Sequence, residues 1–195
     1  VIMIEEVNFL DGYAQIIKPA VPWQHIRSVG EDLVTHDMMV PVFTRIGPYE
    51  IASIHTAGVE KIPVVKKPRV AIIPTGTELE ERASDDMEAG KIVESNSRML
   101  SAFCAEWGAI PLRHNIVVDD PDLLRQAVMK TKDNADILVI CSGSSAGRED
   151  YTSTIIEEFG QVLIHGIATR PGKPAILGII DGKPVIGVPL SLIHI

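Results

Sequence analysis

The sequence has few cysteines and too few basic residues for several classes of protein. Cys104 and Cys141 are its only cysteines, and because they fit no C-x-x-C spacing they indicate neither a zinc site nor a disulfide framework. Lysine and arginine number 18 against 26 aspartates and glutamates, which gives a net charge of −8. That balance argues against a general nucleic-acid-binding protein, which needs a basic surface to displace counterions.

Long hydrophobic runs are also missing. No apolar run approaches the roughly 20 residues that a membrane-spanning helix needs, and no basic segment is followed by an apolar stretch and a cleavage site. We therefore expect no membrane partner, and with two unpaired thiols we expect a reducing, cytoplasmic location. The chain begins at Val1 rather than at Met, so we expect the true start to be missing.

What the sequence does contain is enough apolar material for a core. Hydrophobic residues make up 46% of the 195 positions and charged residues 23%, which is typical of globular proteins. The length allows one ordinary domain and a smaller one.

Residues 1–66 predict a partial, small β-rich and linker region. Residues 1–4 are a plausible strand, Asp11-Gly12 is a hairpin-type turn between apolar runs, and a short helix is expected at about 47–56. Frequent prolines and glycines punctuate the rest.

Residues 67–189 predict an α/β domain. Apolar strands are expected at 69–74, 110–118, 136–141, 162–167 and 175–180, and helices at 95–107, from 120 onward, and from 150 to 159. Strands that alternate with helices favour a mostly parallel sheet with helices on both faces.

Three polar loops follow predicted strands. They lie at residues 74–79, with Thr75, Gly76 and Glu78, at the pair Asp119-Asp120, and at residues 142–150. Because ligands of open α/β sheets bind beyond the carboxyl ends of the strands, these loops together predict one ligand-binding cleft.

The loop at 142–150 is rich in serine and glycine. Its backbone N–H groups and the following helix could hold an anion, although a small flexible connection would have the same composition. It is neither a Walker A sequence nor G-x-G-x-x-G. The binding candidates in it are Ser142, Gly143, Ser144, Ser145 and Gly147.

Carboxylates at the same loops are candidates for a magnesium site, because Mg²⁺ prefers oxygen ligands. Glu78 and Asp150 are the predicted metal ligands, although a solvated loop residue and a helix N-cap are the alternative interpretations. Asp119 and Asp120 are adjacent, so one is expected to cap the next helix and the other to face the cleft.

The segment Arg170-Pro171-Gly172-Lys173-Pro174 places two cations on a stiff, turned backbone. Fixed cations suit phosphate or molybdate oxygens, and an ordinary surface turn is the alternative.

Several motifs in order resemble the molybdopterin molybdotransferases, the family of bacterial MoeA and the gephyrin E domain. They are Gly30-Glu31-Asp32, Pro74-Thr75-Gly76-Thr77-Glu78-Leu79, Glu94-Ser95-Asn96-Ser97-Arg98, Val118-Asp119-Asp120-Pro121, the run from Ser142 to Tyr151, Arg170-Pro171-Gly172-Lys173-Pro174 and Gly187-Val188-Pro189.

The resemblance implies a molybdopterin-binding α/β domain at 67–189 and a reaction. With Mg²⁺, molybdate is inserted into adenylyl-molybdopterin and AMP is released, in a homodimer. Carried over by motif, Glu78, Asp119, Asp150 and Lys173 would be catalytic. Asp32, Thr75, Gly76, the serine-glycine loop and Arg170, Pro171 and Gly172 would bind the pterin and the oxyanion.

The chain departs from the family pattern in several places, among them the start of the serine-glycine loop, where Ser142-Gly143-Ser144-Ser145 stands for Gly-Gly-x-Ser. It also leaves two rival functions open. Arg170 stands where the family usually has lysine, and residues 190–195 form an atypical tail, for which we expect a truncated or mis-terminated reading frame. One rival is a molybdopterin adenylyltransferase, which would consume ATP. The other is a non-catalytic scaffold that binds pterin without turnover.

Overall fold

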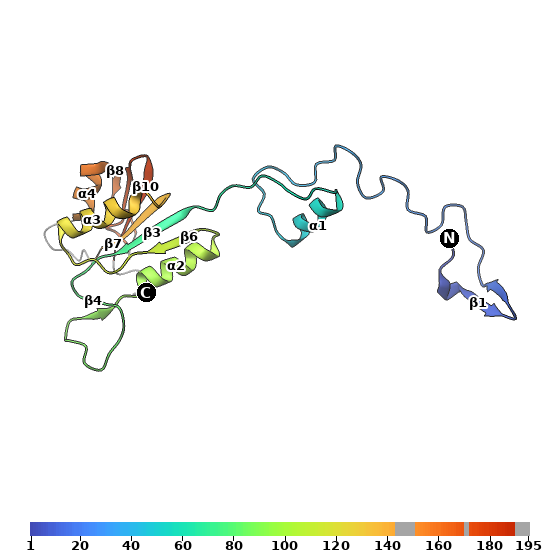
Figure 1. Cartoon of the computed structure of the whole chain (residues 1–195), viewed down its shortest axis with the longest axis horizontal. Helices are drawn as coiled ribbons and strands as arrows, with labels where there is room; N and C mark the ends of the chain where they lie inside the picture. Colours follow the sequence, from blue (N-terminus) through green and yellow to red (C-terminus); the bar gives the residue numbers. More distant parts are fainter. Residues whose placement is uncertain (143–150, 170–171, 190–195) are drawn as a thin grey trace. The chain divides into compact units, whose positions relative to one another are not determined.

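The computed structural model describes residues 1–142, 151–169 and 172–189. The chain divides into two units, Val1–Val64 and Val65–Ile195, which are described separately (Figure 1).

The first unit holds one hairpin and two helical turns of different kinds. Strands β1 (Val7–Leu10) and β2 (Tyr13–Ile16) pair antiparallel. Asp11 and Gly12 between them both have positive φ, +46° and +80°, as a two-residue turn of this hand requires, so the predicted hairpin is confirmed. The predicted helix is α1 (Pro48–Thr56), and the N–H of Gly47 donates to Glu50 at its start (2.9 Å).

The predicted strand at residues 1–4 is wrong. A 3₁₀ helix, η1 (Ile4–Glu6), occupies its end, and the Glu6 N–H donates to the Met3 carbonyl. The pairing of β1 is with β2 alone, so the apolar residues before it have no neighbouring strand with which to form a ladder.

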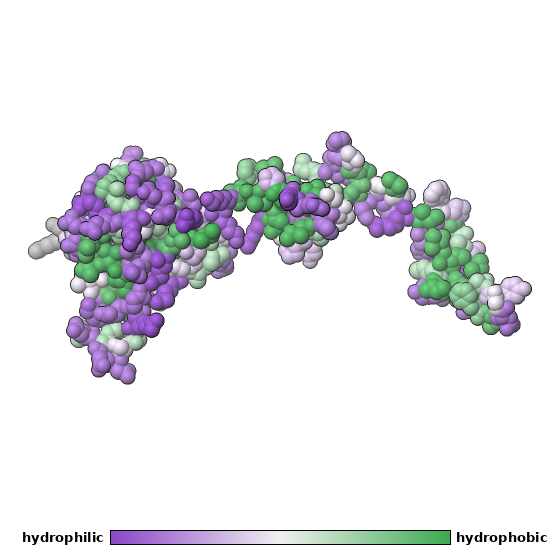
Figure 2. Space-filling model, viewed as in Figure 1, coloured by the Kyte–Doolittle hydropathy of each residue, from purple (hydrophilic) through white to green (hydrophobic). Residues whose placement is uncertain are grey.

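The Val1–Val64 unit has no buried core. Each of its residues is at least partly exposed, and large apolar side chains such as Phe9, Tyr13 and Phe43 are 70%, 79% and 90% exposed. Figure 2 shows hydrophobic residues across its surface. Apolar surface of this extent is typical of a part that is covered by something else.

The second unit is built on a six-stranded sheet with the order β6-β3-β7-β10-β9-β8. Its strands are β3 (Arg69–Pro74), β6 (Ile110–Arg113), β7 (Ile137–Ser142), β8 (Gly160–His165), β9 (Ile176–Ile180) and β10 (Lys183–Pro189). Strands β6, β3, β7 and β10 are parallel neighbours, and β9 alone runs against its neighbours β10 and β8. The mostly parallel sheet is therefore confirmed.

Two strands of the six-stranded sheet differ from the sequence prediction. β6 ends at Arg113 rather than near 118, and beyond it only Val117 makes an isolated bridge, to Thr75. β10 was not predicted at all. Its lysine, proline and glycine weaken the local strand pattern. The strand forms because its backbone hydrogen-bonds to the buried β7.

Helices cover both faces of the sheet, as predicted. In β3, Ile73 packs in the cluster that includes Leu124 of α3 (Pro121–Lys132) and Ile155 of α4 (Tyr151–Phe159). The neighbouring Ile72 faces the other way, into the cluster joined by Leu100 of α2 (Asn96–Glu106). This alternation is why a strand buried on both faces is continuously apolar. In the described part of the chain, no helix has the length and apolar character needed to cross a membrane.

Asp120 caps helix α3, and its neighbour Asp119 does not. The Asp120 carboxylate accepts hydrogen bonds from the backbone N–H groups of Asp122 and Leu123, both 2.9 Å long, and Pro121 occupies the first helical turn. The cap leaves Asp119 available to face the carboxyl edge of the sheet.

Removing this cap tests the assignment. We expect Asp120→Ala to lower the free energy of unfolding of the chain by about 1 kcal/mol, because two backbone donors lose their acceptor. Asp120→Asn is the control, since its side-chain oxygen still caps, and we expect it to lie close to wild type. Urea unfolding followed by circular dichroism measures both. Equal losses in the two variants would mean that charge, and not the cap, is what matters.

Candidate active site

The carboxyl ends of five strands lie at one edge of the sheet. β3, β6, β7 and β10 are parallel, and β8, which pairs antiparallel with β9, runs in the same direction as β10. The segments that follow these strands carry most of the residues predicted as a site. The parallel order is therefore what brings candidate residues from distant parts of the sequence to one edge.

The loop after β3 is fastened to strand β7 and to the segment that follows β6. The backbone N–H of Thr75 donates to the Cys141 carbonyl of β7 (2.8 Å), and that of Gly76 donates to Val117 (3.0 Å). The Thr75 side chain is buried. A Cβ atom at Gly76 would lie 2.8 Å from Leu79 Cγ and 3.0 Å from Glu78 Oε2, so this position requires glycine for the loop to fold back.

Glu78 and Asp119 lie on neighbouring segments of this edge, because Thr75 and Gly76 pair with Val117. Burial raises the pKa of the Asp119 carboxyl above its ordinary value, and the negative charge of Glu78 raises it further. The backbone N–H of Thr77 hydrogen-bonds to Asp119 and opposes the rise. Two carboxylates that share a site disfavour each other's charged form. The structure thus brings together two of the predicted acidic residues.

Lys173 lies at the same edge but farther along the sheet. It belongs to the connection between β8 and β9, where its carbonyl accepts from the Ile167 N–H (2.8 Å). Gly172 has a φ of +103°, a left-handed backbone that favours glycine. The Lys173 side chain is exposed. Three strand spacings separate β3 from β9, about 14 Å, so Lys173 and Glu78 share the edge without direct contact between their backbones.

The remaining predicted residues fall into three groups. Asp32 is in the Val1–Val64 unit, where it is exposed and paired with Arg27, so its place in the site stays a prediction. Ser142 ends β7, opposite Pro189 of β10. The other predicted residues lie outside the described residues: Gly143, Ser144, Ser145, Gly147, Asp150, Arg170 and Pro171.

The described residues contain no group of three or more His, Cys, Asp or Glu side chains that could hold a metal ion. The predicted pair of metal ligands, Glu78 with Asp150, includes a residue outside the described range, and its metal role stays a prediction. Glu78 and Asp119 supply two carboxylates, which is the number of protein ligands that Mg²⁺ often takes when substrate phosphates provide the rest.

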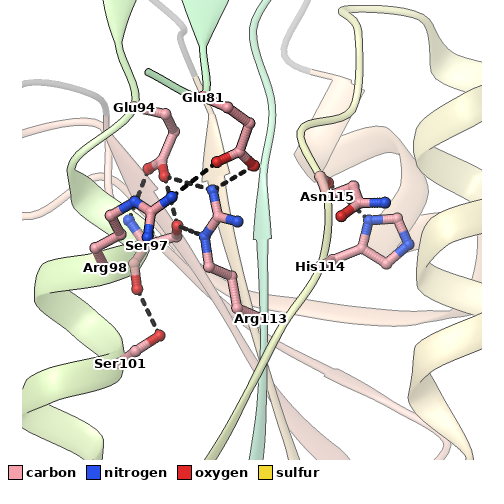
Figure 3. Close-up of polar contacts among 8 residues, drawn as sticks. All are labelled: Glu81, Glu94, Ser97, Arg98, Ser101, Arg113, His114 and Asn115. Carbon is pink, nitrogen blue, oxygen red and sulfur yellow. Dashed lines mark hydrogen bonds and ion pairs between the residues drawn. The ribbon is translucent and has the colours of Figure 1, made fainter. Parts of the chain in front are cut away.

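Beside the site lies an ionic cluster to which the sequence analysis gave no role. Glu94, just after β5 (Ile92–Val93), is buried and accepts from the backbone N–H of Ser97 (2.7 Å) and from its hydroxyl (2.5 Å). Arg113 of β6 donates to Glu94 (3.1 Å) and pairs with Glu81 (2.8 Å). Figure 3 shows the Arg113 guanidinium between the two carboxylates, with Arg98 also paired to Glu81 (3.0 Å).

A signal for this cluster was present in part. Glu94 and Ser97 belong to one of the family-like motifs, but Arg113 and Glu81 stand in no motif and are 32 positions apart in the sequence. The hydrogen bond from Arg113 lowers the pKa of the Glu81 carboxyl. Burial raises the pKa of the Cys141 thiol to about 12, with a contribution from the Glu94 charge, which places Glu94 near the end of β7.

The fold is α/β, with several predicted site residues at the carboxyl edge of a mostly parallel sheet, and comparison with known proteins gives the family. Residues 71–191 match the family described as "Probable molybdopterin binding domain". The chain belongs to this molybdopterin-binding family.

Relatives with established names extend the match over most of the chain. A molybdopterin molybdenumtransferase of Staphylococcus aureus (strain MSSA476) is 32% identical over 189 residues, covering 96% of this chain and 45% of the relative. One of Bacillus subtilis (strain 168) is 38% identical over 150 residues, covering 76% of this chain and 35% of the relative. The family resemblance drawn from the motifs is thereby confirmed.

A solved structure agrees in fold. The crystal structure of the molybdopterin biosynthesis MoeA protein from Pyrococcus horikosii superimposes with a TM-score of 0.74 at 34% identity, covering 97% of this chain and 47% of that one. The chain therefore spans less than half the length of each of these three proteins.

The contact between the two carboxylates generates a prediction. We expect Glu78→Gln to lower the pKa of Asp119 toward its ordinary value of 3.8, because the repelling charge is removed while the burial stays. The titration of the Asp119 carboxyl ¹³C shift measures it. Glu80→Gln is the matched control, since Glu80 lies two residues away and faces Lys91 (3.7 Å).

The same contact fixes the sign of a pH effect. Because folding raises the pKa of Asp119, the folded chain holds this proton more tightly than the unfolded chain, and stability falls as pH rises through the range just above the ordinary aspartate pKa. Asp119→Asn should lack this contribution. The unfolding free energy of the variant minus that of wild type should therefore become more positive as pH rises through this range. A constant difference at all pH values would contradict the assignment.

Proposed function

We propose that this chain is the pterin-binding part of a molybdopterin molybdenumtransferase, which inserts molybdate into adenylyl-molybdopterin and releases AMP. The observation that carries the proposal is the meeting of Glu78 and Asp119 at the carboxyl edge of the sheet, in a chain of a molybdopterin-binding family. The names of the Staphylococcus and Bacillus relatives support the reaction type.

The carboxylate pair fits magnesium. Both side chains offer hard oxygen donors. Burial raises the pKa of Asp119, the Glu78 charge raises it further, and a divalent cation would offset that repulsion. Asp150 is the further ligand that the sequence predicts. When bound, Mg²⁺ would neutralise charge on the phosphate oxygens as the link to AMP breaks.

The other loops of the same edge supply the remaining roles in this proposal. The Thr75-Gly76 turn and the serine-glycine loop from Ser142 to Gly147 would hold the pterin and its phosphate through backbone N–H groups. Arg170 and Lys173 would orient molybdate and offset developing charge. The role of Lys173 is supported by its place on a connection at the carboxyl edge.

The reaction can be measured directly on the 195-residue chain. We expect adenylyl-molybdopterin, molybdate and Mg²⁺ to give AMP, and we expect Glu78→Gln to slow its release about 100-fold, since one electrostatic group of a site is typically worth this much. Glu158→Gln, a change to a surface partner of Arg125 on α4, is the control. Chromatography of AMP measures the rate.

Other outcomes of this assay identify the rival functions. ATP consumption with unmodified molybdopterin would replace the proposal with an adenylyltransferase. Tight binding of adenylyl-molybdopterin with no molybdate-dependent AMP would replace it with a non-catalytic scaffold.

We propose further that the protein works as a homodimer that uses the Val1–Val64 unit. The support is the absence of a buried core in this unit and the exposure of its apolar side chains, among them Leu10 at 65%. Burying such surface against a second copy would supply the missing hydrophobic stabilisation.

Sedimentation equilibrium tests this assembly. We expect the chain to approach twice its monomer mass, and we expect Leu10→Asp to shift it toward monomer because a charge would be buried at the contact. Met129→Asp, on the partly exposed face of α3, is the control and should leave the mass unchanged. A monomer at all concentrations would contradict the proposal.

A further inference from the structure

The ionic cluster of Arg113, Glu81, Glu94 and Ser97 joins the two segments that carry the carboxylate pair. Glu81 and Glu94 bound the long loop between β4 (Leu79–Glu80) and β5 (Ile92–Val93). Arg113 ends β6, six positions before Asp119. A single guanidinium therefore holds both ends of the segment 81–94, which follows Glu78 in the chain, against the strand that leads to Asp119.

The end of this loop also hydrogen-bonds to the backbone at Glu78 and Glu80. The Ile92 N–H donates to the Glu78 carbonyl (2.9 Å), and the Glu94 N–H donates to the Glu80 carbonyl (2.8 Å). On the other side, the Val117 N–H donates to Pro74 (2.9 Å). The backbone is thus fastened at Glu78 and Glu80 and, before Asp119, at Val117, and Arg113 is the side chain common to the two segments.

The cluster is built with more connections than a surface ion pair has. The Glu94 side chain is only 1% exposed and that of Arg113 is 22% exposed. Arg113 Nε also donates to the Ser97 hydroxyl (2.5 Å), so the guanidinium uses its Nε together with the terminal Nη2, which contacts both carboxylates. A planar fork that contacts several acceptors fixes direction as well as distance.

We propose that Arg113 is a positioning residue: by holding Glu81 and Glu94 together at the end of β6, it fixes the loop so that Glu78 faces Asp119. The catalytic consequence of this inference rests on the proposed function, but the position of the loop can be measured without an activity assay. Arg113 acts through the loop and does not touch the ligand.

The deciding variant is Glu81→Ala. Removing Arg113 would leave Glu94 buried without its cation, which threatens the fold, whereas the Glu81 side chain is 43% exposed and its loss leaves the Glu94 contact in place. Glu158→Ala is a matched control, because its side chain is 40% exposed and also pairs with an arginine, Arg125, far from the loop in sequence. Glu81→Gln keeps an oxygen for Arg113 and is the conservative rescue.

Amide hydrogen exchange on the 195-residue chain gives the first readout. In Glu81→Ala, we expect the amides of Ile92 and Glu94 to exchange about tenfold faster than in wild type, with the amides of β3 and β7 unchanged. Glu81→Gln should lie between, and Glu158→Ala should match wild type. A merely structural role would raise exchange in the sheet as well, and either that pattern or no change at Ile92 and Glu94 would overturn the proposal.

The Mg²⁺ dependence of AMP release gives the second readout. We expect Glu81→Ala to need about tenfold more Mg²⁺ for half its maximal rate, as for other residues that orient metal ligands, while the rate at saturating Mg²⁺ stays near wild type. A lower rate at every Mg²⁺ concentration would overturn the positioning role. If the wild-type chain releases no AMP, the proposed function fails, and the exchange experiment alone decides on Arg113.

Discussion

Parallel hydrogen bonding between β3 and its neighbours β6 and β7 is the constraint on which the site depends. The registers Ile72 to Arg113 and Pro74 to Cys141 align the ends of three strands. The segments that leave these ends must start at one edge. Because Thr75 and Gly76 continue to donate to Cys141 and Val117 beyond the strand ends, that alignment extends into the loop that carries Glu78.

Several carboxylates lie near this edge, and most of them are stabilised by hydrogen bonds or by an arginine. Asp120 is satisfied by the N-terminus of α3, and Glu81 and Glu94 are satisfied by Arg113. Asp119 lies close enough to Glu78 to be affected by its charge, and burial together with that charge raises the pKa of Asp119. A pair of titratable groups that is kept in an unfavourable arrangement while its neighbours are neutralised is typical of a functional site.

The two units differ in how far their own sequence stabilises them. In Val65–Ile195, side chains such as Ile72, Ile140 and Ile155 are fully buried, and the helices on both faces close the core. In Val1–Val64, none of the residues is buried, although its apolar content is similar in kind. A hairpin and a short helix are locally encoded, but neither can bury an apolar face alone.

The sequence by itself determined the elements whose signal is local. Continuous apolar strands at β3 and β7, the Asp-Gly turn of the first hairpin and the Asp-Pro start of α3 were all readable from neighbouring residues, as was the family from its ordered motifs. Tertiary structure alone decided that β10 is a strand, that Asp119 rather than Asp120 faces Glu78, and that Arg113 joins Glu81 to Glu94. These depend on contacts between residues tens of positions apart, and a side chain's partner across a sheet leaves no periodic trace in its own segment.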